Sequence, residues 1–216
     1  MSKNFNLLYG FIALLLQFFL ATSSADTKGA GIKQRNDLIA QYGLVDSMPF
    51  QQPCQKITAA LEIPSSCLLL NQNNINAYAF ADGHIMITLG LLLKTQNPDQ
   101  LAHVLAHEQA HITLNHHQSL AEFMRKPPVF FPKKKLKKLR LKQEKQADQM
   151  ANNQIIKAGY DPAQIHHLWQ SLLNKEDSKK WSDHQKLSQR IDKHLLNQAL
   201  IKSPEWQAMI HDLSQR

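Results

Sequence analysis

Residues 97–117 have the sequence NPDQLAHVLAHEQAHITLNHH, which predicts the best-marked helix of the chain. Asn97 suits a helix N-cap, Pro98 suits the first helical position, and Asp99 complements the positive end of the helix dipole. Apolar residues then recur at helical spacing. We therefore expect one helix that begins here and continues toward His117 or beyond.

Within this helix, His107 and His111 stand four residues apart in the pattern H-E-x-x-H. This spacing places both imidazoles on one face, one turn apart, where two nitrogens can converge on one cation. Glu108 lies one residue further on, so its carboxylate would stand beside the metal and could accept a proton from water. The pattern predicts a catalytic zinc site with Glu108 as the general base. The alternative is a pair of ordinary surface histidines.

Three further histidines lie near this motif, and we expect none of them to bind the metal. His103 stands one turn before His107 and is expected to face away from the metal or to line the cleft. His116 and His117 are expected at the surface.

A catalytic zinc site needs a third protein ligand and one open position. The glutamates that follow the motif are Glu122, Glu144, Glu176 and Glu205. Glu144 differs from the others because it shares a helical face with Asp148 and with apolar residues, where a carboxylate without a partner would be costly. We predict that Glu144 is the third ligand and that Asp148 accepts a hydrogen bond from a ligand imidazole. The alternative is an amphipathic helix whose buried face is rotated from the one assumed.

The first 25 residues are typical of a secretory signal peptide. Lys3 is their only charge, residues 7–20 form an apolar run, and Ser23 and Ala25 have the spacing of a small-x-small cleavage site. Because the run is shorter than the roughly 20 residues of a spanning helix, cleavage is favoured over an uncleaved anchor. We expect residues 26–216 to form a single domain that is exported to the periplasm.

The chain is basic, with a formal net charge of +8. A basic surface can contact nucleic acid, an anionic membrane or water, and export argues against nucleic acid. Cys54 and Cys67 are the only cysteines, and in an oxidising compartment two such thiols can form a disulfide. Two buried, unpaired thiols are the alternative.

Short apolar and aromatic runs predict a small sheet at residues 67–70, 76–80 and 84–88. Asp82-Gly83 marks a hairpin turn between the last two. Other helices are expected at residues 33–42, 52–61 and 142–157, and after Asp161-Pro162.

Residues 126–145 have a different composition, and we expect a surface excursion here because three prolines interrupt any helix. Phe130 and Phe131 precede a run from Lys133 to Lys142 that is dominated by Lys, Arg and Leu. The segment from Phe130 to Lys142 could dock on an anionic membrane, with its apolar tip inserted and its Lys side chains near the phosphates. A solvated loop explains the composition equally well, and both interpretations stay open.

The H-E-x-x-H run, followed by EKQAD at residues 144–148, resembles the H-E-x-x-H and E-x-x-A-D pair of the zinc peptidase family that includes HtpX, BepA and the CAAX prenyl protease. Other stretches are similar to segments of the same family: NAYAF at residues 76–80 with GHIMITLGLL at 83–92, AGYDP at 158–162, and His184 with Arg190-Ile191. The resemblance covers roughly residues 34–195, and five motifs in the right order are more specific than any one of them.

The resemblance implies the same zinc ligands, general base and orienting carboxylate that the residues predict. It also implies that His184 and Arg190 lie at the cleft, in a regulatory contact or where they stabilise the developing oxyanion. Gln185 departs from the family pattern, which has proline after this histidine. The substrates that the resemblance implies are misfolded or membrane-associated proteins of the cell envelope.

The fold we expect is α+β, a mostly helical zincin of the gluzincin kind in which a small β-sheet with a hairpin forms one wall of the cleft. An extended peptide substrate would pair with the strand at Asn76, Ala77, Tyr78 and Ala79. The predicted function is a zinc-dependent endopeptidase of the cell envelope. The alternative is a proteolytically silent chaperone-like or adaptor protein that binds unfolded chains in the same cleft.

Overall fold

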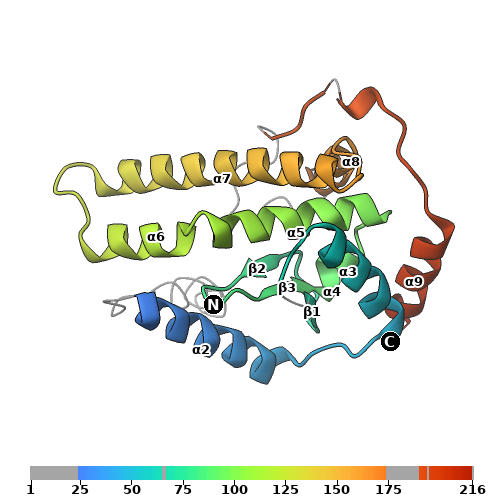
Figure 1. Cartoon of the computed structure of the whole chain (residues 1–216), viewed down its shortest axis with the longest axis horizontal. Coiled ribbons are helices and arrows are strands. Elements are labelled where there is room, and N and C mark those ends of the chain that lie inside the picture. Colours follow the sequence, from blue (N-terminus) through green and yellow to red (C-terminus); the bar gives the residue numbers. More distant parts are fainter. Residues whose placement is uncertain (1–23, 65–66, 174–189, 194, 216) are drawn as a thin grey trace, which may run out of the picture.

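The computed structural model describes residues 24–64, 67–173, 190–193 and 195–215. The helices are α2 (Ser24–Tyr42), α3 (Met48–Ala60), α4 (Leu89–Leu92), α5 (Pro98–Thr113), α6 (His116–Arg125), α7 (Pro132–Lys157), α8 (Gln164–Leu173) and α9 (Pro204–Ser214), with a short 3-10 helix η4 (Leu195–Asn197). The strands are β1 (Cys67–Leu70), β2 (Ala77–Ala79) and β3 (Ile85–Thr88). The predicted α+β, mostly helical architecture is confirmed (Figure 1).

Some predicted features fall outside the described residues. They are residues 1–23 of the predicted signal peptide, and His184. Within the ranges that the structure describes, every helix is too short or too polar to cross a lipid bilayer.

The sheet has the strand order β1-β3-β2. β3 pairs in parallel with β1 and antiparallel with β2, so β2 is an edge strand. The predicted hairpin turn between β2 and β3 is confirmed: Gly83 has φ of 93°, and its N–H donates to the carbonyl of Phe80 at 2.9 Å. A residue with a side chain rarely adopts this positive φ, which explains the glycine.

The sheet lies between helices on both faces. Successive side chains of β3 point to opposite faces, as the pleat requires. Met86 packs with Leu38 of α2 on one face, whereas Ile85 and Ile87 belong to the larger core that α3 and α5 form on the other. Figure 1 shows this layering, with α5 and α2 on opposite sides of the strands.

Helix α5 begins as predicted but ends earlier. Asn97 caps it, because its side chain accepts a hydrogen bond from the N–H of Gln100 at 3.0 Å. The expected continuation to His117 is wrong. The helix ends at Thr113, and Asn115 adopts the left-handed conformation with φ of 52°, which asparagine tolerates better than most residues. The chain then turns into α6, a separate helix.

Residues 126–142 lie at the surface as expected, but the expected interruption of helical structure over residues 126–145 is wrong for most of its length. α7 begins at Pro132, ten residues before the predicted start. Proline fits the first position of a helix, and Lys, Arg and Leu are good helix formers, so the basic run extends α7. Only the short connection from Lys126 to Phe131 is non-helical.

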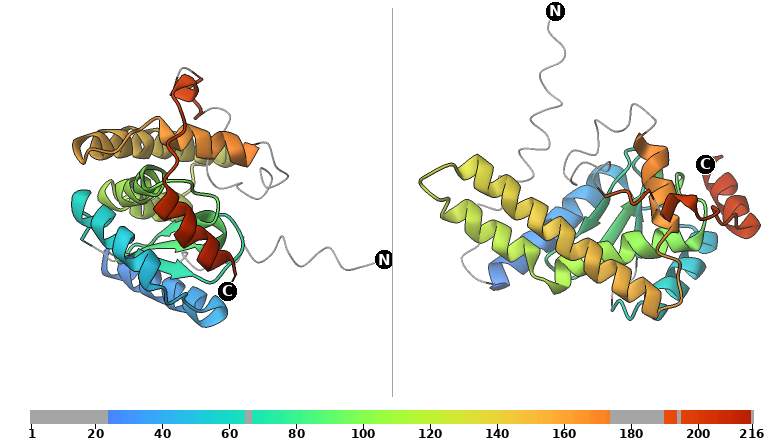
Figure 2. Two further views of the ribbon diagram at one scale, coloured as in Figure 1. Left: turned by 90° about the vertical axis from the view of Figure 1, so that its right-hand side faces the viewer. Right: turned by 90° about the horizontal axis from the view of Figure 1, so that it is seen from above.

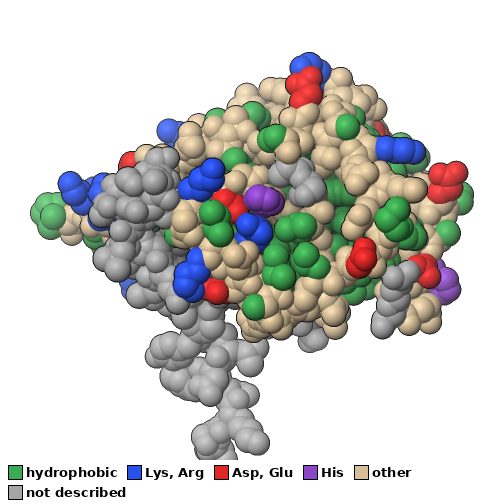
Figure 3. Space-filling model, turned by 60° about the horizontal axis from the view of Figure 1, so that its bottom comes forward, with side chains coloured by type: hydrophobic (Ala, Val, Ile, Leu, Met, Phe, Trp, Pro, Cys, Tyr) green, Lys and Arg blue, Asp and Glu red, His purple; other side chains and the backbone are tan. Residues whose placement is uncertain are grey.

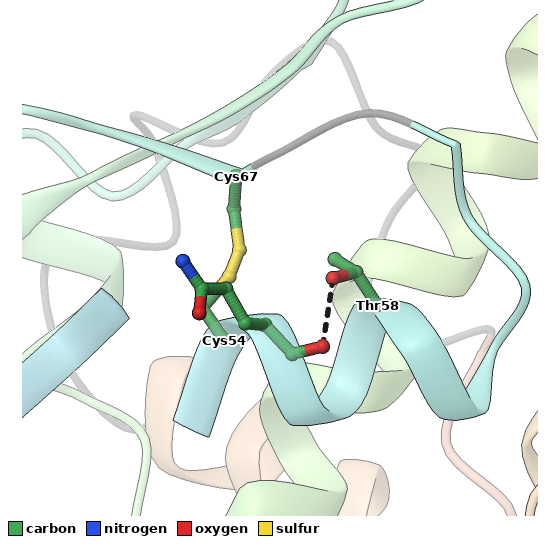
Figure 4. The surroundings of a disulfide bond; sticks show 4 residues. Cys54, Thr58 and Cys67 are labelled. Carbon is green, nitrogen blue, oxygen red and sulfur yellow. Dashed lines mark hydrogen bonds between the residues drawn. A yellow bond between two sulfur atoms is a disulfide. The ribbon is translucent and has the colours of Figure 1, made fainter. Parts of the chain in front are cut away.

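A disulfide joins Cys54 of α3 to Cys67 at the start of β1 (Figure 4), with a Cα–Cα distance of 6.4 Å. The bond ties α3 to the sheet across a sequence separation of 13 residues. In the chain-entropy account, a disulfide closing a loop of this size stabilises the folded state by about 3 kcal/mol.

Candidate metal centre

The H-E-x-x-H residues lie in the second half of α5. His107 and Glu108 are buried, with 4% and 5% of their surface exposed, and His111 is half-buried. α7 runs beside α5 in the views of Figures 1 and 2. Ala147 of α7 is fully buried, and a short side chain there lets the helices approach closely. This approach brings the buried carboxylate of Glu144 to the two imidazoles.

The structure brings the three predicted ligands together. Nε2 of His107 lies 3.1 Å from Nε2 of His111. The two carboxylate oxygens of Glu144 each lie 3.5 Å from one of these nitrogens, Oε2 from that of His107 and Oε1 from that of His111. Ligand atoms about 2.0–2.1 Å from a tetrahedral zinc ion are about 3.3 Å apart, so these separations fit a shared ion. Two imidazoles and a carboxylate with an open position form a donor set typical of catalytic zinc.

The charges around these atoms also favour a cation. Glu144 and Asp148 contribute two formal negative charges, and Arg190 contributes one formal positive charge. With neutral imidazoles, the sum is one negative charge in a largely buried region, which is costly without a partner. A bound cation would offset it.

A second layer of contacts fixes the ring of His107. Its Nδ1 lies 3.0 Å from Oδ1 of Asp148, so Nδ1–H donates to that carboxylate and Nε2 faces the ligand cluster. Arg190 donates from Nε to Oδ2 of Asp148 at 2.9 Å and from Nη2 to Oδ1. Burial raises the pKa of Asp148, but the hydrogen bond from His107 and the charge of Arg190 outweigh it, so the pKa lies well below its usual range.

The nearby carboxylates also raise the pKa of His107. Burial and the nearby Arg190 guanidinium lower this pKa, yet the interactions with Asp148 and Glu144 outweigh both and raise it to about 9. The carboxylates therefore attract a positive charge to this place. A proton supplies that charge in the metal-free protein, and a bound metal ion would replace it.

Residues 49–131 match peptidase family M48. Within this segment the chain is similar to peptidase family M48. The match includes the H-E-x-x-H motif of α5 and ends before Glu144 of α7.

Two curated relatives carry the name beta-barrel assembly-enhancing protease. The protein of Yersinia pestis is 39% identical over 57 residues, and that of Escherichia coli K12 is 37% identical over 57 residues. Each match covers 26% of this chain and 12% of the relative. The chain therefore matches only about an eighth of the length of these relatives.

Arg190 lies beside Asp148, the carboxylate that contacts the ring of His107. Its guanidinium is occupied by Asp148 and also lies 3.7 Å from a Glu144 oxygen. Its Cζ lies 4.5 Å from the ring centroid of Trp169, and only 6% of the side chain is exposed. This placement favours a role in holding Asp148 over the role at the oxyanion that the resemblance implies. No pattern in the sequence connects Trp169 with the site.

His103 lies outside the ligand cluster, as expected. Its Nε2 lies 3.1 Å from Oδ1 of Asn152, and its ring packs edge-on against Trp169. Burial lowers the pKa of His103 to about 3. The imidazole is therefore neutral at physiological pH and serves the packing of α5, α7 and α8.

The expectation that His116 lies at the surface is wrong. Only 6% of its surface is exposed, and its Nδ1 lies 3.0 Å from Nδ1 of His111. The left-handed turn at Asn115 causes this contact, because it directs the first residue of α6 back toward α5. His117 is half-buried, and burial lowers its pKa to about 4. A continuous helix to His117 would not have produced the contact with His111.

His116 is therefore expected to fix the tautomer of His111. For Nε2 of His111 to bind a metal, the proton must stand on Nδ1, and the neutral His116 ring can accept it as a hydrogen bond. The pKa of His116 is lowered by burial, in keeping with a neutral acceptor. We expect His116→Phe to lower zinc affinity by roughly 10- to 100-fold, measured by competition with a chromophoric chelator.

Two matched variants test this role of His116. His116→Gln keeps a hydrogen-bond acceptor and should lose less affinity than the phenylalanine variant. His117→Phe changes the neighbouring imidazole, whose Nε2 makes no hydrogen bond in the structure, and should bind zinc as the wild type does. Equal affinities for His116→Phe and the wild type would contradict the assignment.

The predicted substrate strand lies next to α5. β2, with Ala77, Tyr78 and Ala79, is next to α5 in Figure 1. Asn76 precedes it, and its carbonyl accepts a hydrogen bond from the N–H of Thr88 at 3.1 Å. The edge of the sheet and the H-E-x-x-H helix thus meet at one side of the molecule.

Proposed function

We propose that the protein is a zinc-dependent endopeptidase, with the ion held by His107, His111 and Glu144. One observation carries the proposal: the ligand atoms of these three residues, from two different helices, all lie within 4.8 Å of one another. The family M48 match of the α5 region supports it. When bound, zinc would supply Lewis acidity that polarises the scissile carbonyl and the attacking water.

The chain's own residues would then move and orient the protons. Glu108 follows His107 directly on α5, so we assign it as the base that accepts the proton of the attacking water and passes it to the leaving amine. Asp148 keeps the proton of His107 on Nδ1, which leaves Nε2 available as a ligand. Arg190 holds Asp148 in place and is a positioning residue in this scheme. His184, outside the described residues, remains a predicted regulatory or oxyanion-stabilising residue.

The edge strand gives a route for peptide binding. A substrate in extended conformation would pair with the backbone of Asn76 to Ala79, as in β-strand addition. Because β2 lies beside α5, such a strand would pass along the helix that carries Glu108. The affinity would then come from backbone hydrogen bonds, which allows many sequences to bind.

We place the protein in the cell envelope as a single catalytic domain of residues 26–216, exported by a signal peptide of residues 1–25. The predicted signal peptide, the disulfide and the names of the two relatives support this location. Misfolded or membrane-associated envelope proteins are the proposed substrates.

The Glu108→Gln variant tests the proposed activity. Glutamine has nearly the same shape as glutamate but cannot accept the proton, so we expect cleavage of an unfolded protein to fall by about 100- to 10,000-fold at unchanged zinc content. The measurement follows fragments of a reduced, unfolded substrate by gel electrophoresis and mass spectrometry. Glu122→Gln makes the same change on the exposed face of α6 and should cleave normally.

The outcomes separate the candidate functions. If Glu108→Gln loses cleavage while the wild type and Glu122→Gln keep it, the result supports the peptidase. If the zinc-loaded wild type binds the unfolded substrate but leaves it intact, the silent chaperone-like or adaptor function takes precedence. If Glu108→Gln cleaves as fast as the wild type, Glu108 is not the base.

A further inference from the structure

Helices α6 and α7 form an antiparallel hairpin whose far end projects beyond the sheet. Figure 1 and the right-hand view of Figure 2 agree on this projection. The connection at its end carries Val129, Phe130 and Phe131, which are 89%, 72% and 72% exposed. Three consecutive large apolar side chains at a convex end cannot pack against their own chain. We call residues 129–131 the hairpin tip.

Positive charge surrounds the hairpin tip. Residues 125–142 contain nine basic residues and no acidic one: Arg125, Lys126, Lys133, Lys134, Lys135, Lys137, Lys138, Arg140 and Lys142. Since the whole chain has a formal net charge of +8, the rest of the chain sums to −1. The excess positive charge of the protein is thus concentrated on the two helices next to the tip.

These basic side chains are directed to solvent. The lysines at the start of α7 are exposed, and within the described part of the chain no ion pair neutralises any of the nine. Figure 3 shows hydrophobic side chains beside Lys and Arg at the left edge of the molecule, where Figure 1 has the end of the hairpin. In an anionic lipid surface, a layer of phosphates covers the hydrocarbon. The apolar tip fits the hydrocarbon layer, and the positive charges behind it fit the phosphate layer.

We propose that the hairpin tip inserts into the surface of an anionic lipid bilayer and that the flanking lysines and arginines bind the lipid phosphates. Nucleic acid would satisfy the positive charge, and unpaired bases stack on phenylalanine rings, but Val129, the most exposed side chain of the tip, would have no apolar environment there. A bilayer satisfies both features. This inference is independent of the catalytic activity, because it concerns binding alone.

The test is sedimentation with lipid vesicles of the zinc-loaded protein, expressed from its complete reading frame and purified in the form the cell produces. We expect binding to vesicles of phosphatidylglycerol and phosphatidylcholine, at least tenfold weaker binding to phosphatidylcholine alone, and weakening by salt. Phe130→Ser with Phe131→Ser should reduce binding to the anionic vesicles at least tenfold. Neutralising Lys133, Lys134 and Lys135 to glutamine should have a similar effect.

Matched variants keep the test specific to the hairpin. Met48→Ser removes an apolar side chain that is 63% exposed on α3, and a Lys28, Lys56 and Lys202 triple change to glutamine removes three charges elsewhere. Both should bind vesicles as the wild type does. Circular dichroism and zinc content confirm that each variant is folded.

Three results would overturn the proposal. They are equal binding by the tip variant and the wild type, an equal loss in the control triple variant, and retention of a single-stranded oligonucleotide without binding to vesicles. The last would identify nucleic acid as the partner of the basic helices. Cleavage of a soluble peptide, measured in parallel, should be unchanged in the tip variant, so loss of membrane binding and loss of activity are distinguishable.

Discussion

Glu144→Gln is expected to lower the zinc affinity of the protein by more than about 100-fold and to abolish peptide cleavage at limiting zinc. Changes to residues that only orient a zinc ligand cost 10- to 100-fold in affinity, and the loss of a charged ligand should cost more. Glutamine keeps the volume of Glu144 between α5 and α7, so the helix packing is retained. Only the negative charge and one strong oxygen donor disappear.

Zinc affinity of this variant is measured by chelator competition at pH 7.5, and folding by urea denaturation of the metal-free proteins. Glu122→Gln is the matched control, because it removes one carboxylate from an exposed position on α6. It should bind zinc as the wild type does. If Glu144→Gln bound zinc equally well, the third ligand would have to be another residue, and the three-residue cluster would lose its assigned role.

The second large effect concerns Arg190. Its replacement by methionine should lower the free energy of unfolding of the metal-free protein by about 3–5 kcal/mol. The guanidinium bridges Asp148 and Glu144, and its removal takes away the permanent positive charge that both carboxylates face, leaving the His107 ring as their shared contact. Bound zinc supplies positive charge in the same place, so the loss should be smaller in the zinc-loaded protein.

A double variant separates charge from packing in this test. If the cost comes from the carboxylate charge that Arg190 no longer balances, Arg190→Met combined with Asp148→Asn should be more stable than Arg190→Met alone. Lys33→Met serves as a control, since it removes an exposed ion pair with Asp37 and should change stability by less than about 1 kcal/mol. Urea denaturation gives all four values. A wild-type stability for Arg190→Met would show that the bridge contributes little.

The candidate ligands could be predicted because their geometry is local. A spacing of four residues on one helix fixes the relation of His107 to His111 whatever the rest of the chain does. The carboxylates of the later helix stood on an otherwise apolar face, so a partner was required for them. The edge strand and its turn were predictable from Asp82-Gly83 for the same local reason.

Other features depended on a single backbone angle or on distant contacts. The left-handed conformation at Asn115 ended α5 early and placed His116 on His111, and helical periodicity carries no signal of such a break. Three prolines suggested a loop where Pro132 in fact begins α7. The contact of Arg190 with Trp169 joins residues from separate segments, so no local pattern could indicate it.

Helix α7 connects the hairpin tip to the candidate metal centre as one continuous helix. Phe131 stands at its N-terminal cap, and Glu144 follows thirteen residues later in the same continuous helix. At 1.5 Å per residue, these positions are about 20 Å apart along the axis. A tip embedded in lipid would hold the ligands no more than about that height above the headgroups, a span that roughly six residues of extended chain can cover. The length of α7 would then determine how far from the bilayer surface a polypeptide emerging from it is cut.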